Sequence, residues 1–318
     1  MQSMRHFINT GDYDRATLET ILTHAMTHRG ERSTALSGRT VALMFFDSSL
    51  RTRASFAVGI AQLGGTSVTF EVGRGTWNLE YQEGVVMDGD KPEHIADAAQ
   101  VLSRYFDVLA IRCFPSLKRP EEDAADPVIE AFRRYATVPV INLESALYHP
   151  CQAMADMLTI RERFGRTEGV RVALAWTPHI KALPTAVPNS FALVAAQLGC
   201  RLTIVAPPEF PLPDVVMERL GDVEVVHDQS VLARQDVVYA KSWASLVNYG
   251  APPPARYRDW ILTPEKLGSA RFLHCLPLRR NVEVTDAVLA SAQNDCYDEA
   301  ENRLHVQKSI LQFCLHLI

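Results

Sequence analysis

Short runs of apolar residues alternate along the chain with longer stretches in which apolar residues recur every three or four positions. The runs have the length of strands buried on both faces, and the stretches have the spacing of helices that bury one side. A repeated order of strand and helix is typical of a parallel α/β protein. In the first half, the pattern predicts strands at 41–46, 67–70, 108–111 and 138–141 and helices near 54–63, 95–105 and 126–135.

The second half repeats this pattern after one long helix, predicted at 146–164, which would bridge two domains. Two sheets of four or five strands are more credible than one continuous sheet. We therefore expect a first domain at 1–148 and a second at 149–298, and the segment 299–317 again has helical spacing. The second domain would contain strands at 171–175, 201–205, 223–226, 237–240 and 271–274 and a helix at 189–198.

Composition narrows the class of protein without naming a reaction. The 318 residues carry a formal net charge of −5, which gives no support for binding nucleic acid or an acidic membrane surface. No apolar run reaches the length of a membrane span, and the start of the chain lacks the hydrophobic region of a signal peptide. The six cysteines form no C-x-x-C pair, so we expect no metal site and a reducing cytoplasm.

The segment Ser49-Leu50-Arg51-Thr52-Arg53 follows the apolar strand at 41–46 after two intervening residues and leads into the next predicted helix. Free backbone N–H groups at the start of a helix point at whatever lies above the sheet edge. Two hydroxyls and two guanidiniums at such a turn are suited to an anion, and open α/β sheets bind ligands at this edge. The segment therefore predicts a site for a phosphate or a similar dianion.

Two further motifs follow, His149-Pro150-Cys151-Gln152 and His274-Cys275-Leu276-Pro277. Each is a weak signal alone. With Ser-x-Arg-Thr-Arg they resemble, in order and over nearly the whole chain, the transcarbamylases, which transfer a carbamoyl group from carbamoyl phosphate to an amine. The resemblance implies two parallel-sheet α/β domains of the aspartate/ornithine transcarbamylase type, joined by long helices. It also implies that a C-terminal helix at about 299–318 returns to complete the first domain.

The resemblance assigns roles at the carbamoyl phosphate end of the site. His149 would donate to the carbonyl oxygen, Gln152 would hold the carbamoyl amide, and backbone carbonyls of Cys275 and Leu276 would bind NH2 groups. Direct attack by the amine needs no thiol intermediate, and neither a metal nor an organic cofactor is implied. The catalytic residues would be Arg51, Arg112, His149, Gln152 and Cys275, with Ser49, Leu50, Thr52, Glu144, Pro150, Cys151, Leu276 and Arg303 binding substrate.

The second half of the chain resembles the transcarbamylases that act on N-acylated ornithines. The resemblance lies in Trp176-Thr177-Pro178-His179, the proline-rich 181–188 and Asn189-Ser190, a loop that in that subfamily belongs to a knotted chain path. The stretch 239–244 lacks the Ser-Met-Gly of ornithine enzymes. Its Lys241 would repel a free α-ammonium but suits a carboxylate, and His179 and Arg279 could likewise receive carboxylates.

Three positions bear on the acyl group and the assembly. Pro92 stands where acetylornithine enzymes carry a glutamate and succinylornithine enzymes a proline, and a glutamate would repel a succinyl carboxylate. Trp77, in the segment 76–80, resembles a loop residue that reaches into a neighbouring subunit's site, which implies a homotrimer with shared sites. Glu283 departs from the pattern, because acetyl enzymes carry a lysine there.

The hypothesis from sequence is carbamoyl transfer to the δ-amine of N-succinyl-L-ornithine, giving N-succinyl-L-citrulline and phosphate in arginine biosynthesis, with N-acetylornithine as the alternative substrate. A dinucleotide-dependent oxidoreductase would need a glycine fingerprint and a ribose-binding acid, and the sequence has neither. A non-catalytic paralogue that only binds carbamoyl phosphate is disfavoured, because Arg51, Arg112, His149, Gln152 and Arg303 are all retained.

Overall fold

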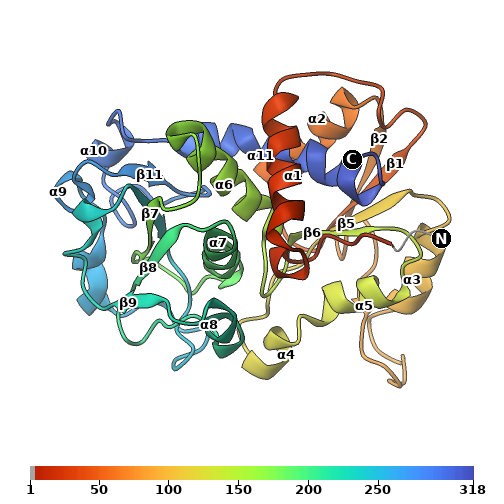
Figure 1. Cartoon of the computed structure of the whole chain (residues 1–318). Coiled ribbons are helices and arrows are strands. Elements are labelled where there is room, and N and C mark those ends of the chain that lie inside the picture. The colour runs from red at the N-terminus through yellow and green to blue at the C-terminus, as the bar shows by residue number, and fades with distance from the viewer. Residues whose placement is uncertain (1–3) are drawn as a thin grey trace.

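A computed structural model describes residues 4–318 of the chain. Met1–Ser3, which belong to the stretch considered above for a signal peptide, lie outside the described residues. The main strands form two separate sheets, one in each half of the chain (Figure 1). The strands are β1 (Thr40–Phe45), β2 (Thr66–Glu71), β3 (Leu79–Glu80), β4 (Glu93–His94), β5 (Val108–Arg112), β6 (Val140–Glu144), β7 (Arg171–Trp176), β8 (Arg201–Val205), β9 (Glu224–Val226), β10 (Val237–Lys241) and β11 (Arg271–Leu273).

Helices connect the strands and cover the faces of the sheets. The α-helices are α1 (Arg15–Thr27), α2 (Arg51–Gln62), α3 (Ile95–Leu102), α4 (Pro120–Ala124), α5 (Pro127–Tyr135), α6 (Pro150–Phe164), α7 (Ala186–Gln197), α8 (Asp214–Leu220), α9 (Pro264–Leu267), α10 (Asp286–Leu289) and α11 (Cys296–Cys314). Three short 3-10 segments complete the set, at Thr10–Asp12, Leu232–Arg234 and Ala255–Trp260.

The first sheet has four strands in the order β2-β1-β5-β6, and the second has five in the order β11-β10-β7-β8-β9. All pairs within these sheets are parallel. The prediction of two parallel α/β domains is therefore confirmed. Because the strands of each sheet run the same way, their carboxyl ends share one edge, where loops can gather functional side chains. The domain boundary between residues 148 and 149 stays a prediction.

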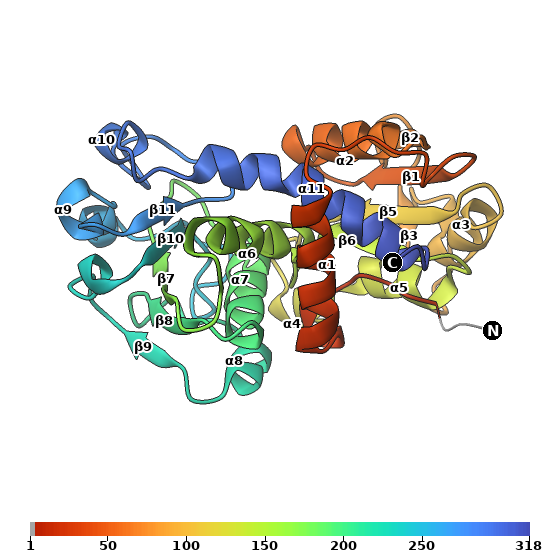
Figure 2. The same ribbon diagram turned by 45° about the horizontal axis from the view of Figure 1, so that its top comes forward.

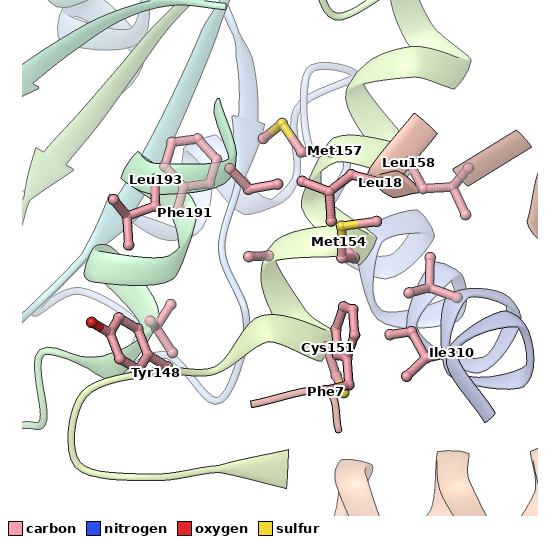
Figure 3. Close-up of a cluster of buried hydrophobic side chains, with 14 of the residues drawn as sticks. Phe7, Leu18, Tyr148, Cys151, Met154, Met157, Leu158, Phe191, Leu193 and Ile310 are labelled. Atoms are coloured by element: carbon pink, nitrogen blue, oxygen red, sulfur yellow. The ribbon is translucent and has the colours of Figure 1, made fainter. Parts of the chain in front are cut away.

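Helix α6 joins the two halves and lies at the centre of the core. All its residues from Pro150 to Ile160 are buried. Met154 and Leu158 pack in one cluster with Leu18 of α1, Phe191 of α7 and Ile310 of α11 (Figure 3). One apolar cluster thus spans both halves, and burial of this area is the main term that holds them together.

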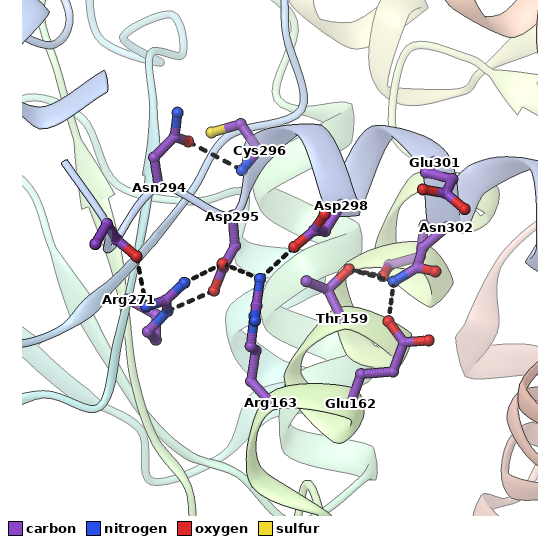
Figure 4. A network of polar contacts seen from close by, with 12 residues as sticks. Thr159, Glu162, Arg163, Arg271, Asn294, Asp295, Cys296, Asp298, Glu301 and Asn302 are labelled. Atoms are coloured by element: carbon purple, nitrogen blue, oxygen red, sulfur yellow. Dashed lines mark hydrogen bonds and ion pairs between the residues drawn. The ribbon is translucent and has the colours of Figure 1, made fainter. Parts of the chain in front are cut away.

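The C-terminal helix α11 begins beside β11 in the second half and ends over the first sheet (Figure 2). It contacts α6, α2 and α1, and its assignment to the first domain stays a prediction. Polar contacts fix its start: Asp295 pairs with Arg163 of α6 at 2.6 Å, and Asn302 donates to Thr159 of α6 at 2.9 Å (Figure 4). Because Asp295 is only 1% exposed, removal of its arginine partners would leave a buried carboxylate without compensation.

Several helix starts differ from the sequence prediction, and two of these helices lead into the site. Helix α6 begins at Pro150, not at 146, because residues 145–148 form a turn in which the Ser145 N–H donates to the Tyr148 carbonyl at 2.9 Å. Helix α2 begins at Arg51, three residues earlier than expected, so Arg51 and Thr52 lie in its first turn. In the part of the chain that is described, no helix combines the length and apolar character that crossing a membrane requires.

Candidate active site

A cavity of about 840 Å³ lies at the carboxyl ends of the two sheets, where both halves of the chain contribute side chains. The first half contributes the ends of β1, β2, β5 and β6 and the start of α2. The second half contributes the end of β10, the loop after β11 and part of the proline-rich loop. The predicted site residues that line it are Ser49, Leu50, Arg51, Thr52, Arg112, Glu144, His149, Gln152, His179, Lys241, Cys275, Leu276, Arg279 and Arg303.

One end of the cavity gathers three guanidiniums, those of Arg51, Arg112 and Arg303. Arg303 reaches from α11 to the first turn of α2, where it donates to the Thr52 hydroxyl at 2.5 Å. Burial lowers the pKa values of Arg51 and Arg303, and the charge of Arg112 adds to the effect on both. Within residues 4–318, the buried Nε–H groups of all three arginines find no acceptor. This end is therefore built for an anion that brings several acceptor oxygens.

His149 lies beside this cluster, immediately before α6. Its backbone N–H donates to the Ser190 hydroxyl of α7 at 2.8 Å, and its Nε2 lies 3.6 Å from Glu144, which also pairs with Arg112 at 2.5 Å. Burial first, and then the charges of Arg303, Arg112 and Arg51, lower the His149 pKa well below its usual value. The ring is therefore neutral near pH 7 and can donate a hydrogen bond without giving up its proton.

The opposite end of the cavity carries the cationic or donor side chains of His179, Lys181, Lys241 and Arg279. Arg279 Nε donates to His179 Nε2 at 3.2 Å, and His179 Nδ1 lies 3.0 Å from the Lys181 carbonyl. Lys241 ends β10 and is almost completely buried. A second substrate with carboxylates would find matching charge here.

The loop after β11 forms part of the cavity wall. The Leu276 N–H donates to His274 Nδ1 at 2.9 Å, and Leu276 has a left-handed φ of 49°. A leucine rarely adopts this conformation, and such residues cluster at functional sites. Burial raises the pKa of the Cys275 thiol to about 12, so it stays protonated and is a poor nucleophile.

Four predicted site residues do not line this cavity. Cys151 faces the core, where its thiol donates to the Asn142 carbonyl at 3.5 Å (Figure 3). Pro150 is the first residue of α6, a position that suits its fixed φ and missing N–H. Trp77 and Pro92 lie exposed in the segment between β2 and α3. A role for these last two would require a neighbouring subunit and stays a prediction.

Sequence reasoning missed several side chains that the fold brings to the site. Lys181 belongs to the proline-rich loop, and Arg74 comes three residues after the end of β2. Glu283, which the sequence singled out without a role, lies behind the cavity lining: it is 1% exposed and accepts the Arg279 N–H at 2.6 Å. Arg74 could have been found by its place after a strand end, but the role of Glu283 depends on contacts that only the fold creates.

Potential metal ligands do not gather in this site. Within residues 4–318, no three or more His, Cys, Asp or Glu side chains are arranged to hold a metal ion. Among the charged residues that face the cavity, arginines and lysines outnumber carboxylates, which suits anionic substrates.

Comparison with known proteins places the chain in a family. The carbamoyl-P binding domain of the aspartate/ornithine carbamoyltransferases matches residues 5–162, and their Asp/Orn binding domain matches residues 180–314. The chain belongs to the aspartate/ornithine carbamoyltransferase family. The two matches correspond to the two sheets, and the cavity lies where they meet.

Individual relatives match almost the whole chain. An N-acetylornithine carbamoyltransferase of Xanthomonas campestris pv. campestris is 42% identical over 97% of this chain and 97% of its own length. An N-succinylornithine carbamoyltransferase of Bacteroides thetaiotaomicron is 36% identical over 83% of this chain and 84% of its own. One solved structure is an N-acetyl-L-ornithine transcarbamylase in which a glutamate is replaced by proline, complexed with carbamyl phosphate and N-succinyl-L-norvaline. It superposes on this chain with a TM-score of 0.93 at 42% identity, and the match covers 97% of this chain and 99% of that one.

Carbamoyl transfer makes three demands that can be compared with this carbamoyltransferase cavity. A leaving phosphate needs positive charge, a carbonyl oxygen needs a donor, and an amine needs a fixed approach to the carbonyl carbon. The arginine cluster, neutral His149 and the loop at Cys275 and Leu276 all line this one space.

Proposed function

We propose that this carbamoyltransferase moves the carbamoyl group of carbamoyl phosphate to the δ-amine of an N-acylated ornithine. The observation that carries the proposal is the convergence of three guanidiniums, those of half-buried Arg51 and of buried Arg112 and Arg303, on the space that also holds His149 and Gln152. The phosphate would bind among the guanidiniums and the first N–H groups of α2. The relative with 42% identity carries the same general activity in its name.

In the proposed reaction, the uncharged δ-amine attacks the carbamoyl carbon and the bond from that carbon to the phosphate oxygen breaks. Phosphate leaves with the bonding electrons, and the proton of the amine goes to the phosphate or to solvent. His149 donates to the carbonyl oxygen as negative charge develops on it, and Arg51 and Arg112 neutralise the leaving group. Cys275 and Leu276 hold the NH2 groups with backbone carbonyls.

An acylated α-amine fits the other end of the cavity. Acylation removes the positive charge that Lys241, Lys181 and Arg279 would otherwise repel, while the α-carboxylate remains as their partner. A free ornithine would bring an ammonium into this cationic environment. The charges of the cavity therefore favour N-acylornithine over ornithine.

For the acyl group we propose succinyl, because Pro92 places no carboxylate against the second carboxylate of that group. A proline variant of an acetylornithine enzyme has been solved with N-succinyl-L-norvaline, which supports the idea that proline is compatible with a succinyl group. The second candidate is N-acetyl-L-ornithine, which the higher overall identity to acetylornithine enzymes favours. Overall identity averages over many positions that do not contact the acyl group. The charge next to the acyl group, in contrast, can depend on a single residue.

Pro92 and Trp77 face solvent in a single chain, so this proposal includes an assembly. We propose a homotrimer in which the segment that holds both residues completes the cavity of a neighbouring subunit. The product would be N-succinyl-L-citrulline, with a place in arginine biosynthesis.

A parallel assay tests the function. Purified protein is incubated with carbamoyl phosphate and, separately, ornithine, N-acetylornithine or N-succinylornithine, and the citrulline derivative and phosphate are quantified. We expect product with the acylated amines, most rapidly with N-succinylornithine, and little with ornithine. Absence of carbamoyl-phosphate-dependent product with every amine would refute the activity. A faster reaction with N-acetylornithine would refute only the acyl assignment.

A further inference from the structure

Two carboxyl groups that the proposed chemistry does not use lie directly behind Gln152. They belong to Asp156, one turn further along α6, and Glu299, in the first turn of α11, and both are 0% exposed. Isolated buried carboxylates are costly, so a fully buried pair beside a substrate-binding side chain calls for a physical explanation.

The Gln152 amide faces this pair with its nitrogen. Nε2 donates to Asp156 Oδ1 at 2.8 Å and to Glu299 Oε1 at 2.9 Å. A primary amide has two N–H groups, and both are used here. The remaining polar atom, Gln152 Oε1, is buried and has no donor anywhere in the described part of the chain, yet the residue lines the cavity. The amide thus presents an acceptor, and only an acceptor, to the cavity.

The opposite amide orientation would place Oε1 against two carboxyl oxygens. Burial raises the pKa of Asp156 to about 7. Burial and, after it, the charge of Asp156 raise the pKa of Glu299 well above its usual value. The pair therefore keeps a proton near neutral pH. A single shared proton still leaves more acceptor than donor capacity toward Gln152. The observed orientation is therefore the favoured one.

Glu299 also holds a second part of the site. Its Oε2 accepts the backbone N–H of His274 at 2.8 Å, at the start of the wall that contains Leu276. One carboxyl group thus fixes both groups assigned to the carbamoyl NH2, the Gln152 side chain and the Leu276 backbone. One turn away, the contacts of Asp295 with Arg163 and Arg271 hold α11 in place (Figure 4).

We propose that Asp156 and Glu299 are positioning residues that lock the Gln152 carbonyl oxygen toward the cavity, so that the site selects a carbamoyl NH2 donor over an acyl phosphate that carries a methyl group there. The inference rests on the proposed use of carbamoyl phosphate. It deepens that function by naming what enforces the choice of acyl donor. A methyl group in place of NH2 would leave the locked acceptor buried and unpaired.

The test compares three ligands: carbamoyl phosphate, acetyl phosphate and inorganic phosphate. Dissociation constants are measured for the wild type and for the double variant Asp156→Asn with Glu299→Gln, which keeps the shape but lets the Gln152 amide turn. We expect the wild type to prefer carbamoyl phosphate over acetyl phosphate by at least about tenfold, the value of one unmade hydrogen bond. The preference should fall to within about threefold in the double variant, with inorganic phosphate binding nearly unchanged.

Glu162→Gln, the same change of carboxyl to amide at the outer part of the α6–α11 contact, is the matched control and should keep the wild-type preference. A double variant that binds all three ligands more weakly by one common factor, or that keeps the full preference, would overturn the proposal. If the double variant does not fold, the wild type still decides: equal affinity for acetyl and carbamoyl phosphate also overturns it. Wild-type protein that binds inorganic phosphate but not carbamoyl phosphate would instead refute the proposed function.

Discussion

The indole N–H of Trp77 donates to the Glu93 carboxylate at 2.6 Å. The bond links the early part of the segment between β2 and α3 to its late part. It holds the Trp77 ring, which is 58% exposed, against Glu93, the residue that directly follows Pro92. Trp77 and Pro92 are therefore parts of one exposed surface. We therefore assign both residues to the cavity of a neighbouring subunit.

Mixing of two inactive variants tests whether this surface serves a neighbour. Arg51→Ala removes a residue of the chain's own cavity, and Trp77→Ala removes one that we assign to the adjacent cavity. Each variant alone should be nearly inactive. Random exchange of equal amounts should restore roughly a quarter of the sites to wild-type composition, because one subunit supplies Arg51 and its neighbour supplies Trp77.

The readout is carbamoyl transfer after subunit exchange, verified with two differently tagged chains. Each variant put through the same exchange with itself is the control and should stay inactive. No recovery of activity in verified mixed oligomers would show that Trp77 acts within its own subunit.

Replacement of Pro92 by glutamate should move the substrate preference from N-succinylornithine toward N-acetylornithine. The new carboxylate repels the second carboxylate of succinyl but not a neutral acetyl group, and each 1.4 kcal/mol of this difference changes the ratio of kcat/KM values about tenfold. Pro92→Gln adds a side chain of the same length without charge and should shift the ratio much less. Equal losses for both substrates in both variants would mean that Pro92 only shapes the loop.

Local signals account for the part of the site that was predicted from sequence. Arg112 ends β5 and Arg51 follows β1, so their meeting at the carboxyl edge of the first sheet follows from parallel topology, and Lys241 lies at the corresponding edge of the second sheet for the same reason. The resemblance to transcarbamylases added Arg303, whose distant place in the chain carries no local signal. The strands at 108–111 and 201–205 were predicted within one residue because buried parallel strands are continuous apolar runs.

Features that depend on packing between distant segments could not be predicted. Helix α1 was not predicted, although Asp14 caps it and its apolar face packs on α6 and α11. Asp156 and Glu299 lie far apart in the sequence, and only the contact between α6 and α11 brings both to Gln152. A buried acid has no distinctive signature in one sequence, because its burial is a property of the fold.

Loss of Arg51 should abolish most of the activity. Arg51→Ala removes one of three charges that face the leaving phosphate, so kcat/KM should fall by roughly two orders of magnitude or more, and inorganic phosphate should bind more weakly. Arg133→Ala is the matched control, because Arg133 lies on α5, pairs there with half-exposed Glu130 and does not line the cavity. Its kinetics should equal those of the wild type. Near-normal activity of Arg51→Ala would exclude the arginine cluster as the phosphate site.

The last prediction concerns Glu283, a buried carboxylate that holds the far side of the cavity wall. Burial alone would raise its pKa, but the contact with His274, the charge of Lys241 and the hydrogen bond from the Arg279 N–H outweigh burial and lower the pKa to about 2. Its charged form is therefore favoured in the folded protein. A pKa depressed from about 4.5 to about 2 contributes roughly 3 kcal/mol of stability, fully present above pH 4.5 and lost as the pH falls toward 2.

Glu283→Gln should consequently lower the free energy of unfolding near pH 7, and the difference from the wild type should shrink as the pH is lowered below about 4.5. Urea denaturation of both proteins between pH 3 and pH 7 measures this. Glu218→Gln, at an exposed position on α8, should match the wild type throughout. A loss of stability in Glu283→Gln that is the same at every pH would mean that Glu283 stabilises the wall through shape and packing, because a charge-dependent contribution must disappear once the wild-type carboxylate is protonated.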